Sequence, residues 1–349
     1  MPSGDAETRK IDLHSHFFPA RARELLKEGV GRIRIANPDN MGRVFLYDSY
    51  TGHALTYFSE GSPHVDLEQR IRSMDHYGIE LQVVSVSPPN VDVIPDADSA
   101  SKLARVINDG LAEAAQKYKG RFMALATLPM TNAGAAIDEA KRASKDLGMR
   151  GALLSSNVNK LFYDQMAEIE AVFRTLQELG MFAFIHPTEP VTWAQVGEDY
   201  NLNLIYAWPF DTTVSAARIA FSGLLQRLPN LRIVLAHGGG MIPFYEGRLK
   251  MLAQDLRGRG KERTFAVKDP VGELKKYYYD AAVFSPASVR LLVDFAGSDR
   301  VIFGSDYPFG PEGGNACYGQ GLTAIEVSLE SREKDKVLSQ NAAQLLGLA

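Results

Sequence analysis

The chain has 349 residues, of which 45% are hydrophobic and 23% are charged, and its formal net charge is −4. This balance is typical of a globular protein with a large core, and it excludes a strongly basic surface for nucleic acid or anionic membranes. The one cysteine, Cys317, excludes an internal disulfide framework and a cysteine-rich metal site.

The N-terminal segment MPSGDAETRK is polar and lacks the apolar stretch of a signal peptide. Farther along, no window approaches 18 uninterrupted apolar residues, the length that a membrane-spanning helix requires. We therefore expect a cytoplasmic protein with no membrane partner and no nucleic-acid partner.

The first expected strand, KIDLHSH at 10–16, places two of the seven histidines one residue apart. Side chains at i and i+2 of a strand point to the same face, so His14 and His16 project together. Two neighbouring imidazoles are typical of a metal site, but the pair alone does not separate such a site from a chance arrangement.

A long stretch separates this strand from the next, with more residues than one connecting helix needs. Within it, GRIRIA, GRVFLYDS and HALTYF alternate in polarity like short strands, and PDN and TG provide turns. We expect residues 30–60 to form a small antiparallel β insertion between the first strand and the first helix. It serves either as a lid that shapes a substrate pocket or as a packing or oligomer contact.

Further apolar runs, separated by stretches with helical periodicity, are expected strands at 81–88, 122–129, 151–156, 181–187, 232–239, 277–283 and 301–308. Strands that are apolar almost throughout are buried on both faces, as parallel strands are. Eight strand–helix units predict an α/β fold of the TIM (β/α)8 barrel type. The alternative is an open, doubly wound parallel sheet.

Polar residues gather at the C-terminal ends of these strands, where barrel active sites are built. The first strand ends in His14 and His16, the fifth in His186, the sixth in His237 and the eighth in Asp306. Imidazoles and a carboxylate form a nitrogen–oxygen ligand set that suits zinc, with manganese, iron or cobalt as alternatives. The other histidines, His53, His64 and His76, are expected to be structural or on the surface.

These motifs carry a resemblance to a known family. H-x-H after the first strand, HP after the fifth, AHGGG after the sixth and GSDYPF after the eighth resemble the metal-dependent amidohydrolase superfamily. Within it, the chain resembles the decarboxylase branch typified by 2-amino-3-carboxymuconate-6-semialdehyde decarboxylase. The likeness runs nearly end to end, which implies a single barrel domain over 1–349.

The resemblance implies a role for each matching residue. The metal ligands would be His14, His16, His186 and Asp306. His237 would hold a metal-activated water and transfer protons, with Asp306 assisting. Arg248 would reach a neighbouring subunit's site and bind a substrate carboxylate, and Phe309 would line the pocket.

Two departures from the family's pattern stand out. The fourth strand reads GALLSS where dinuclear members carry a bridging lysine, and the nearest lysine, Lys160, comes later, so we expect one divalent metal per subunit. The insertion reads YTGHALTY where the branch carries an arginine that grips the substrate beside its departing carboxylate. The resemblance makes His53, near that place, a candidate substrate-binding residue, and the alternative is that Arg43 reaches in from an adjacent strand. Trp208, after the fifth strand, lines the pocket or packs in the core.

These assignments predict a metal-dependent, non-oxidative decarboxylase of a small unsaturated or aromatic carboxylic acid, acting as a homodimer or larger homo-oligomer. His237 would take a proton from the activated water and return it to carbon. The alternative is a hydrolase or hydratase that opens a lactone or hydrates a double bond in the same site. A non-catalytic barrel is a third possibility, which the complete set of ligand residues disfavours.

Overall fold

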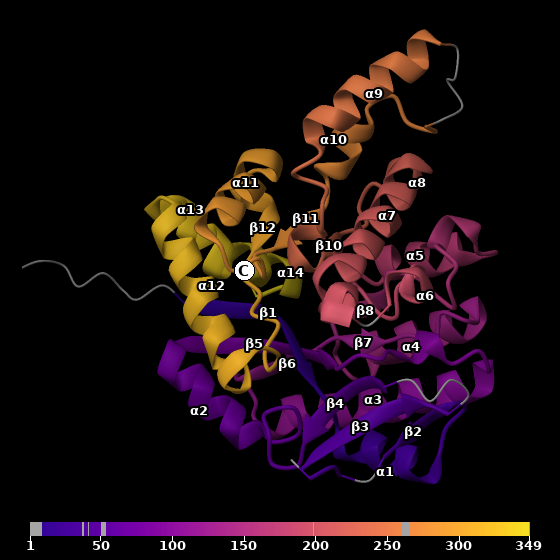
Figure 1. Ribbon diagram of the computed structural model, residues 1–349, viewed down its shortest axis with the longest axis vertical. Helices are drawn as coiled ribbons and strands as arrows, with labels where there is room; N and C mark the ends of the chain where they lie inside the picture. Colours follow the sequence, from indigo (N-terminus) through magenta and orange to yellow (C-terminus); the bar gives the residue numbers. More distant parts are fainter. Residues whose placement is uncertain are drawn as a thin grey trace, which may run out of the picture.

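The computed structural model describes residues 9–36, 38–40, 42–49, 54–197, 199–259 and 265–348. Parallel strands form its centre (Figure 1). They are β1 (Lys10–Phe17), β5 (Ile79–Val86), β6 (Phe122–Ala124), β7 (Ala126–Thr127), β8 (Gly151–Ser155), β9 (Phe182–His186), β10 (Ile233–Leu235), β11 (Tyr278–Asp280) and β12 (Val301–Ile302).

These strands close into a barrel. Their order is β1-β5-β6 in one sheet and β7-β8-β9-β10-β11-β12 in the other. Between β6 and β7, Leu125 donates its N–H to the carbonyl of Val84, so the two short strands act as one. At the other seam, Leu13 N–H donates to Phe303 O over 3.0 Å and His16 N–H to Tyr307 O over 2.7 Å. The segment after β12 therefore pairs with β1, and the expected TIM barrel is confirmed.

Helices follow the strands and cover the barrel. They are α1 (Ala20–Glu28), α2 (Leu67–Tyr77), α3 (Ala97–Lys117), α4 (Ala133–Lys145), α5 (Ile169–Glu178), α6 (Trp193–Val196), α7 (Trp208–Phe221), α8 (Leu224–Arg227), α9 (Glu246–Gly258), α10 (Pro270–Leu274), α11 (Pro286–Ala296), α12 (Asn315–Ser328), α13 (Ser331–Asp335) and α14 (Asn341–Leu346). None of the helices in the described part of the chain has the length and apolar character of a membrane span.

Local sequence explains where the helices begin and end. The carboxylate of Asp66 accepts the N–H groups of Glu68 and Gln69 at the start of α2, and Gly78 ends that helix in the left-handed conformation. On α3, Leu103, Ile107 and Leu111 recur at helical spacing and are buried.

The expected β insertion is present as an antiparallel sheet of β2 (Ile33–Ile35), β3 (Arg43–Asp48) and β4 (Ala54–Ser59). Val44, Leu46 and Phe58 form its buried side. The sequence placed it between the first strand and the first helix, and the structure places it between the short helix α1 and α2. The polar sequence ARARELLKE of α1 has only Ala22 and Leu26 on its buried side. The hydrophobic periodicity of this segment was therefore too weak to predict a helix.

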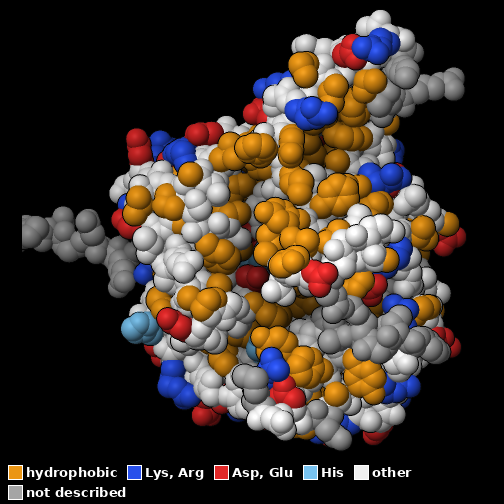
Figure 2. Space-filling view, in the orientation of Figure 1, with side chains coloured by type: hydrophobic (Ala, Val, Ile, Leu, Met, Phe, Trp, Pro, Cys, Tyr) orange, Lys and Arg blue, Asp and Glu red, His pale blue; other side chains and the backbone are white. Residues whose placement is uncertain are grey.

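One face of the molecule carries exposed apolar side chains. Helix α9 projects from the body of the molecule (Figure 1), and Figure 2 shows hydrophobic side chains from α9 to a hollow in the middle of this face. We call the exposed set around α9 and the start of α7 the apolar band. It consists of Tyr200, Leu204, Ile205, Tyr206, Phe244, Tyr245 and Met251.

A buried asparagine joins α3 to the barrel. Asn108 accepts the N–H of Thr127 over 2.7 Å, and its amide donates to Thr127 O over 2.9 Å and to Glu139 Oε1 over 2.7 Å. At this residue β7 pairs with β8, and the Asn108 side chain binds both the N–H and the carbonyl of Thr127.

We predict that Asn108→Ala lowers the free energy of unfolding by about 2–4 kcal/mol, because it leaves buried main-chain groups of Thr127 without partners. Urea denaturation measures the change. The control is Asn132→Ala, which removes an exposed helix cap that accepts the N–H of Ala135 and should cost about 1 kcal/mol. Equal losses in the two variants would contradict the structural role of Asn108.

Candidate metal centre

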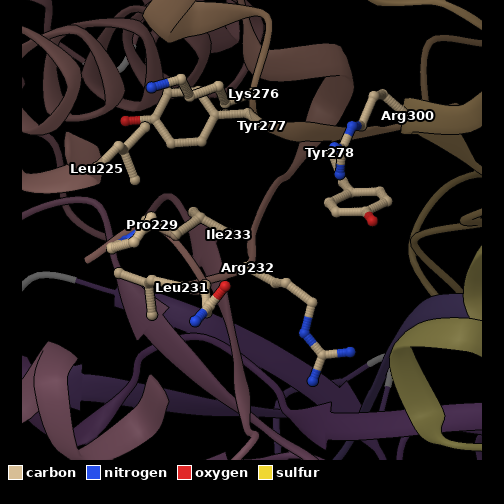
Figure 3. A pocket seen from close by; sticks show the side chains of 10 residues that line it. Leu225, Pro229, Leu231, Arg232, Ile233, Lys276, Tyr277, Tyr278 and Arg300 are labelled. Atoms are coloured by element: carbon tan, nitrogen blue, oxygen red, sulfur yellow. The ribbon is translucent and has the colours of Figure 1, made fainter. Parts of the chain in front are cut away.

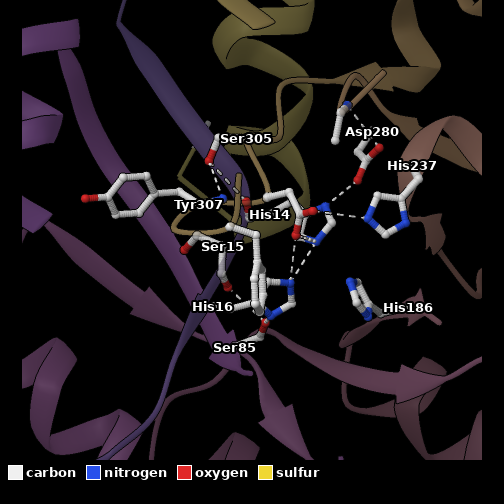
Figure 4. A network of polar contacts seen from close by, with 12 residues as sticks. His14, Ser15, His16, Ser85, His186, His237, Asp280, Ser305 and Tyr307 are labelled. Atoms are coloured by element: carbon white, nitrogen blue, oxygen red, sulfur yellow. Dashed lines mark hydrogen bonds and ion pairs between the residues drawn. The ribbon is translucent and has the colours of Figure 1, made fainter. Parts of the chain in front are cut away.

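The strand ends bring the predicted site residues together at the C-terminal mouth of the barrel (Figure 4). One nitrogen or oxygen atom from each of His14, His186, His237 and Asp306 lies within 4.8 Å of the others. His16 joins them, since its Nε2 lies 3.0 Å from His14 Nε2. The fold therefore brings together the five side chains that the sequence placed at the strand ends.

The two oxygens of Asp306 face different partners. Oδ1 lies 3.3 Å from His14 Nε2 and 3.2 Å from His16 Nε2, whereas Oδ2 lies 3.5 Å from His237 Nε2. Ligand atoms that share one ion at about 2.0–2.2 Å stand roughly 3.0–3.5 Å apart. The four residues whose ligand atoms all lie within 4.8 Å of one another include His237 and not His16. The shared Oδ1 nevertheless groups His16 with His14, and His237 reaches only the other oxygen.

The partners of the imidazoles fix their tautomers. His14 Nδ1 lies 2.6 Å from Asp280 Oδ2, His16 Nδ1 lies 3.1 Å from Val86 O, and His186 Nδ1 lies 2.7 Å from Pro187 O. Because these oxygens accept hydrogen bonds, each Nδ1 carries the proton and each Nε2 presents a lone pair to the centre.

The fit to a metal ion rests on a buried atom. His186 Nε2 is buried and has no hydrogen-bond partner among the described residues. His14 Nε2 and His16 Nε2, at 3.0 Å, would both offer lone pairs to the same space. A cation shared by these atoms satisfies all of them at once, so the donor set fits a divalent metal.

The pKa shifts of the three imidazoles differ in direction, and two of them favour the neutral form that binds a metal. Burial lowers the pKa of His16, and burial together with the nearby imidazoles holds the pKa of His186 well below its usual range. Burial also acts to lower the pKa of His14, but the carboxylates of Asp306 and Asp280 raise it. Burial opposes ionisation of Asp306, yet His14, His16 and His237 hold the pKa of its carboxyl well below 3.8.

The two residues that follow the strand ends have unusual backbone conformations. His237 has φ of +53° and Asp306 has φ of +60°, in the left-handed region that non-glycine residues rarely adopt. His237 therefore lies beyond the end of β10, in a turn, where the sequence predicted a strand through 239. At Gly240 a Cβ atom would lie 2.2 Å from Pro209 O, so the turn requires glycine there.

Two buried aspartates support the site from behind. Asp280 Oδ1 accepts the N–H of Gly238 over 2.9 Å while its Oδ2 holds His14, so one carboxylate fixes a histidine and the turn of His237. Sequence reasoning did not single out Asp12, although its alternation with His14 on β1 was a usable sign.

Other predicted residues lie at the edge of the site. The ring of Phe309 is 5.3 Å from that of His16, and the ring of Trp208 is 6.0 Å from that of His186. The indole Nε1 of Trp208 and the hydroxyl of Thr188 are buried without a partner in the described part of the chain, and both residues line a small pocket.

His64 also lies here, packed against Phe309, a position compatible with the structural or surface place that the sequence suggested. Its ring is 4.8 Å from that of Phe309. Burial, with Arg70 and His16 nearby, lowers the pKa of His64 to about 3, so its imidazole is uncharged at neutral pH.

The cations considered from sequence stand away from the centre. Arg43 pairs with Asp39 at 2.7 Å, so it does not reach into the site as the sequence allowed. Lys160 pairs with Glu189 at 2.7 Å. Arg248 is exposed on α9, and His53 lies outside the described residues.

Comparisons with known proteins place this geometry in a wider group. A family model described as amidohydrolase matches residues 11–348. The chain is 30% identical to 2-amino-3-carboxymuconate-6-semialdehyde decarboxylase of Dictyostelium discoideum, over 97% of this chain and 92% of that protein. It is 33% identical to gamma-resorcylate decarboxylase of Polaromonas sp. strain JS666, over 69% of this chain and 77% of the relative.

The fold of the chain is also similar to that of a solved structure. Dihydroxybenzoic acid decarboxylase from Polaromonas sp. JS666, with bound manganese and the inhibitor 2-nitroresorcinol, superposes with a TM-score of 0.77. It is 26% identical in sequence, and the match covers 98% of this chain and 97% of that one.

We predict that Asp280→Asn weakens metal binding by about 10- to 100-fold, because a neutral amide no longer fixes the tautomer of His14 and raises its basicity less. Competition with a chromophoric chelator measures the affinity. Asp294→Asn, at a carboxylate that binds Arg290 on α11, makes the same chemical change away from the site and should leave the affinity unchanged. Equal affinity in both variants would contradict the role of Asp280.

Proposed function

The chain belongs to the amidohydrolase family, in its decarboxylase branch, and from this premise we propose that it is a metal-dependent enzyme that releases CO2 non-oxidatively from a small aromatic or unsaturated carboxylic acid. The observation that carries the proposal is the set of inward-facing Nε2 lone pairs beside Asp306. Among them, the Nε2 of His186 is buried and has no partner in the part of the chain that the structure describes. Such an arrangement is costly unless it holds a cation.

His14, His16, His186 and Asp306 would hold the metal. The spacing of Asp306 Oδ1 from the first two imidazoles supports this set. His237 would remain outside the coordination sphere, because it faces Oδ2 instead. Three imidazoles and a carboxylate suit zinc, and manganese is the alternative that the related dihydroxybenzoic acid decarboxylase structure supports.

When bound, the metal supplies Lewis acidity toward a substrate oxygen and lowers the pKa of a coordinated water. Loss of CO2 leaves an electron pair on carbon, which must be quenched by a proton. His237 is suited to deliver it, since its side chain is 17% exposed at the mouth and its Nε2 lies 3.5 Å from Asp306 Oδ2. The Asp306 carboxylate can orient that imidazole and stabilise its protonated form.

The walls of the mouth suit a flat substrate. Phe309 presents its ring beside His16, and Trp208 presents an indole beside His186. The buried Trp208 Nε1 and the Thr188 hydroxyl, which have no partner among the described residues, would donate hydrogen bonds to an oxygen of the substrate. On the insertion, Phe58 packs 5.7 Å from Phe18, just beyond β1, which supports a role for residues 30–60 as a lid.

We further propose that two chains associate through the apolar band. Tyr200 is 87% exposed and Phe244 is 75% exposed, and such side chains in contact with water favour association. Arg248 lies on the projecting helix α9, beside this band, and its guanidinium is exposed. In a homodimer, α9 of one chain would bring Arg248 to the partner's mouth, where it would bind the substrate carboxylate.

We predict that chelation abolishes CO2 release from the substrate acid and that a divalent metal restores it, while His237→Ala keeps its metal and loses turnover by about 100-fold or more. Metal analysis, headspace CO2 and product mass are the measurements. Near-normal turnover in His237→Ala would contradict its role. A product that gains the mass of water would contradict decarboxylation and favour the hydrolase or hydratase alternative.

We predict that the Arg248→Ala variant is inactive on its own. Activity should return in mixed dimers that contain one Arg248→Ala chain and one His237→Ala chain. Each mixed dimer contains one site with both residues intact, so an equal mixture recovers roughly a quarter of wild-type turnover. The two variants are unfolded together, refolded and assayed, with each variant alone as the control. No recovery in verified mixed dimers would contradict a role for Arg248 in the partner's site.

A further inference from the structure

A second cavity lies at the opposite end of the barrel from the metal centre. Its volume is about 470 Å³, within the usual range for small-molecule sites. Arg232, Tyr278 and Arg300 line it, and they stand just before or at the start of β10, β11 and β12 (Figure 3). The metal centre is built from the other ends of these strands, so the two sites are separate.

One wall of the cavity is apolar. Leu225, Pro229, Leu231 and Ile233 lie together there, away from the guanidinium groups of Arg232 and Arg300 (Figure 3). A purely electrostatic site for an inorganic ion would not need such a wall. It favours a ligand that has an apolar body as well as a charged group.

The polar side of the cavity is cationic. Arg232, Lys276 and Arg300 line it, and none of the described lining residues is an aspartate or a glutamate. Lys276 is neutralised by Glu273, which lies 2.7 Å away. The charges of the two arginines are not neutralised in this way in the described part of the chain.

The two arginines are held in place by uncharged groups. Arg232 donates to the main-chain carbonyls of Gly180 and Leu345. The guanidinium carbon of Arg300 lies 4.6 Å from the ring centroid of Tyr278. A guanidinium carries five donors in a rigid fork, so both side chains keep N–H groups for a further acceptor.

We infer that this cavity binds a small organic anion, with a carboxylate, phosphate or sulfonate on the side lined by Arg232 and Arg300 and an apolar body against Leu225, Pro229 and Leu231. The apolar wall selects against a bare inorganic anion. The two guanidinium groups that line the cavity select against a neutral ligand, which would leave both of them without an anionic partner.

Isothermal titration of the metal-loaded enzyme with 1-naphthyl phosphate tests the site. We expect saturable binding that weakens about 10-fold or more in Arg300→Gln, because a charge-assisted contact is lost, and less in Arg300→Lys, which keeps the charge. Inorganic phosphate should bind more weakly than the naphthyl ester. Arg227→Gln is the matched control, since Arg227 pairs with Glu170 and does not line the cavity.

Chelation separates this site from the metal centre. We expect the binding that depends on Arg300 to persist in metal-free enzyme, whether or not decarboxylase activity is found. Absence of saturable binding would overturn the inference. So would binding that is unchanged in Arg300→Gln with its melting temperature intact, or binding that disappears on removal of the metal.

Discussion

The seam between β1 and the segment after β12 determines where the metal ligands can stand. Asp12 is completely buried there, and its Oδ1 accepts the N–H of His14 over 3.2 Å and the N–H of Ser305 over 3.0 Å. Its Oδ2 accepts the hydroxyl of Ser305 over 2.6 Å and the amide of Gln82 over 2.8 Å. One carboxylate thus joins the ligand-bearing ends of the first and last strands, which lie far apart in the sequence.

Burial raises the pKa of Asp12, although the hydrogen bonds from Ser305 and Gln82 oppose that shift. The same network continues to Arg70, which is buried and donates to Gln82 Oε1 over 2.7 Å and to the carbonyl of His16. This arrangement holds a polar layer directly beneath the site. Its hydrogen bonds position the backbone of the H-x-H pair, and the open Nε2 atoms are left for the metal.

Sequence reasoning succeeded where a short-range pattern determines the answer. Strand alternation pairs His14 with His16, and the barrel topology brings His186, His237 and Asp306 to the same face. It could not identify contacts between residues that lie far apart in the chain, such as the contact of the His64 ring with Phe309. The position of the Arg43 side chain likewise depends on its ion pair with Asp39 inside the insertion. No periodicity in the sequence reveals that pair.

X-ray absorption spectroscopy of the metal-loaded protein tests the central claim most directly, because it reports the atoms around the ion. The account predicts nitrogen and oxygen ligands at about 2.0–2.2 Å, with scattering from three imidazoles that falls to two in His186→Ala. A spectrum without imidazole scattering, or one unchanged by that substitution, would contradict a shared metal at this seam.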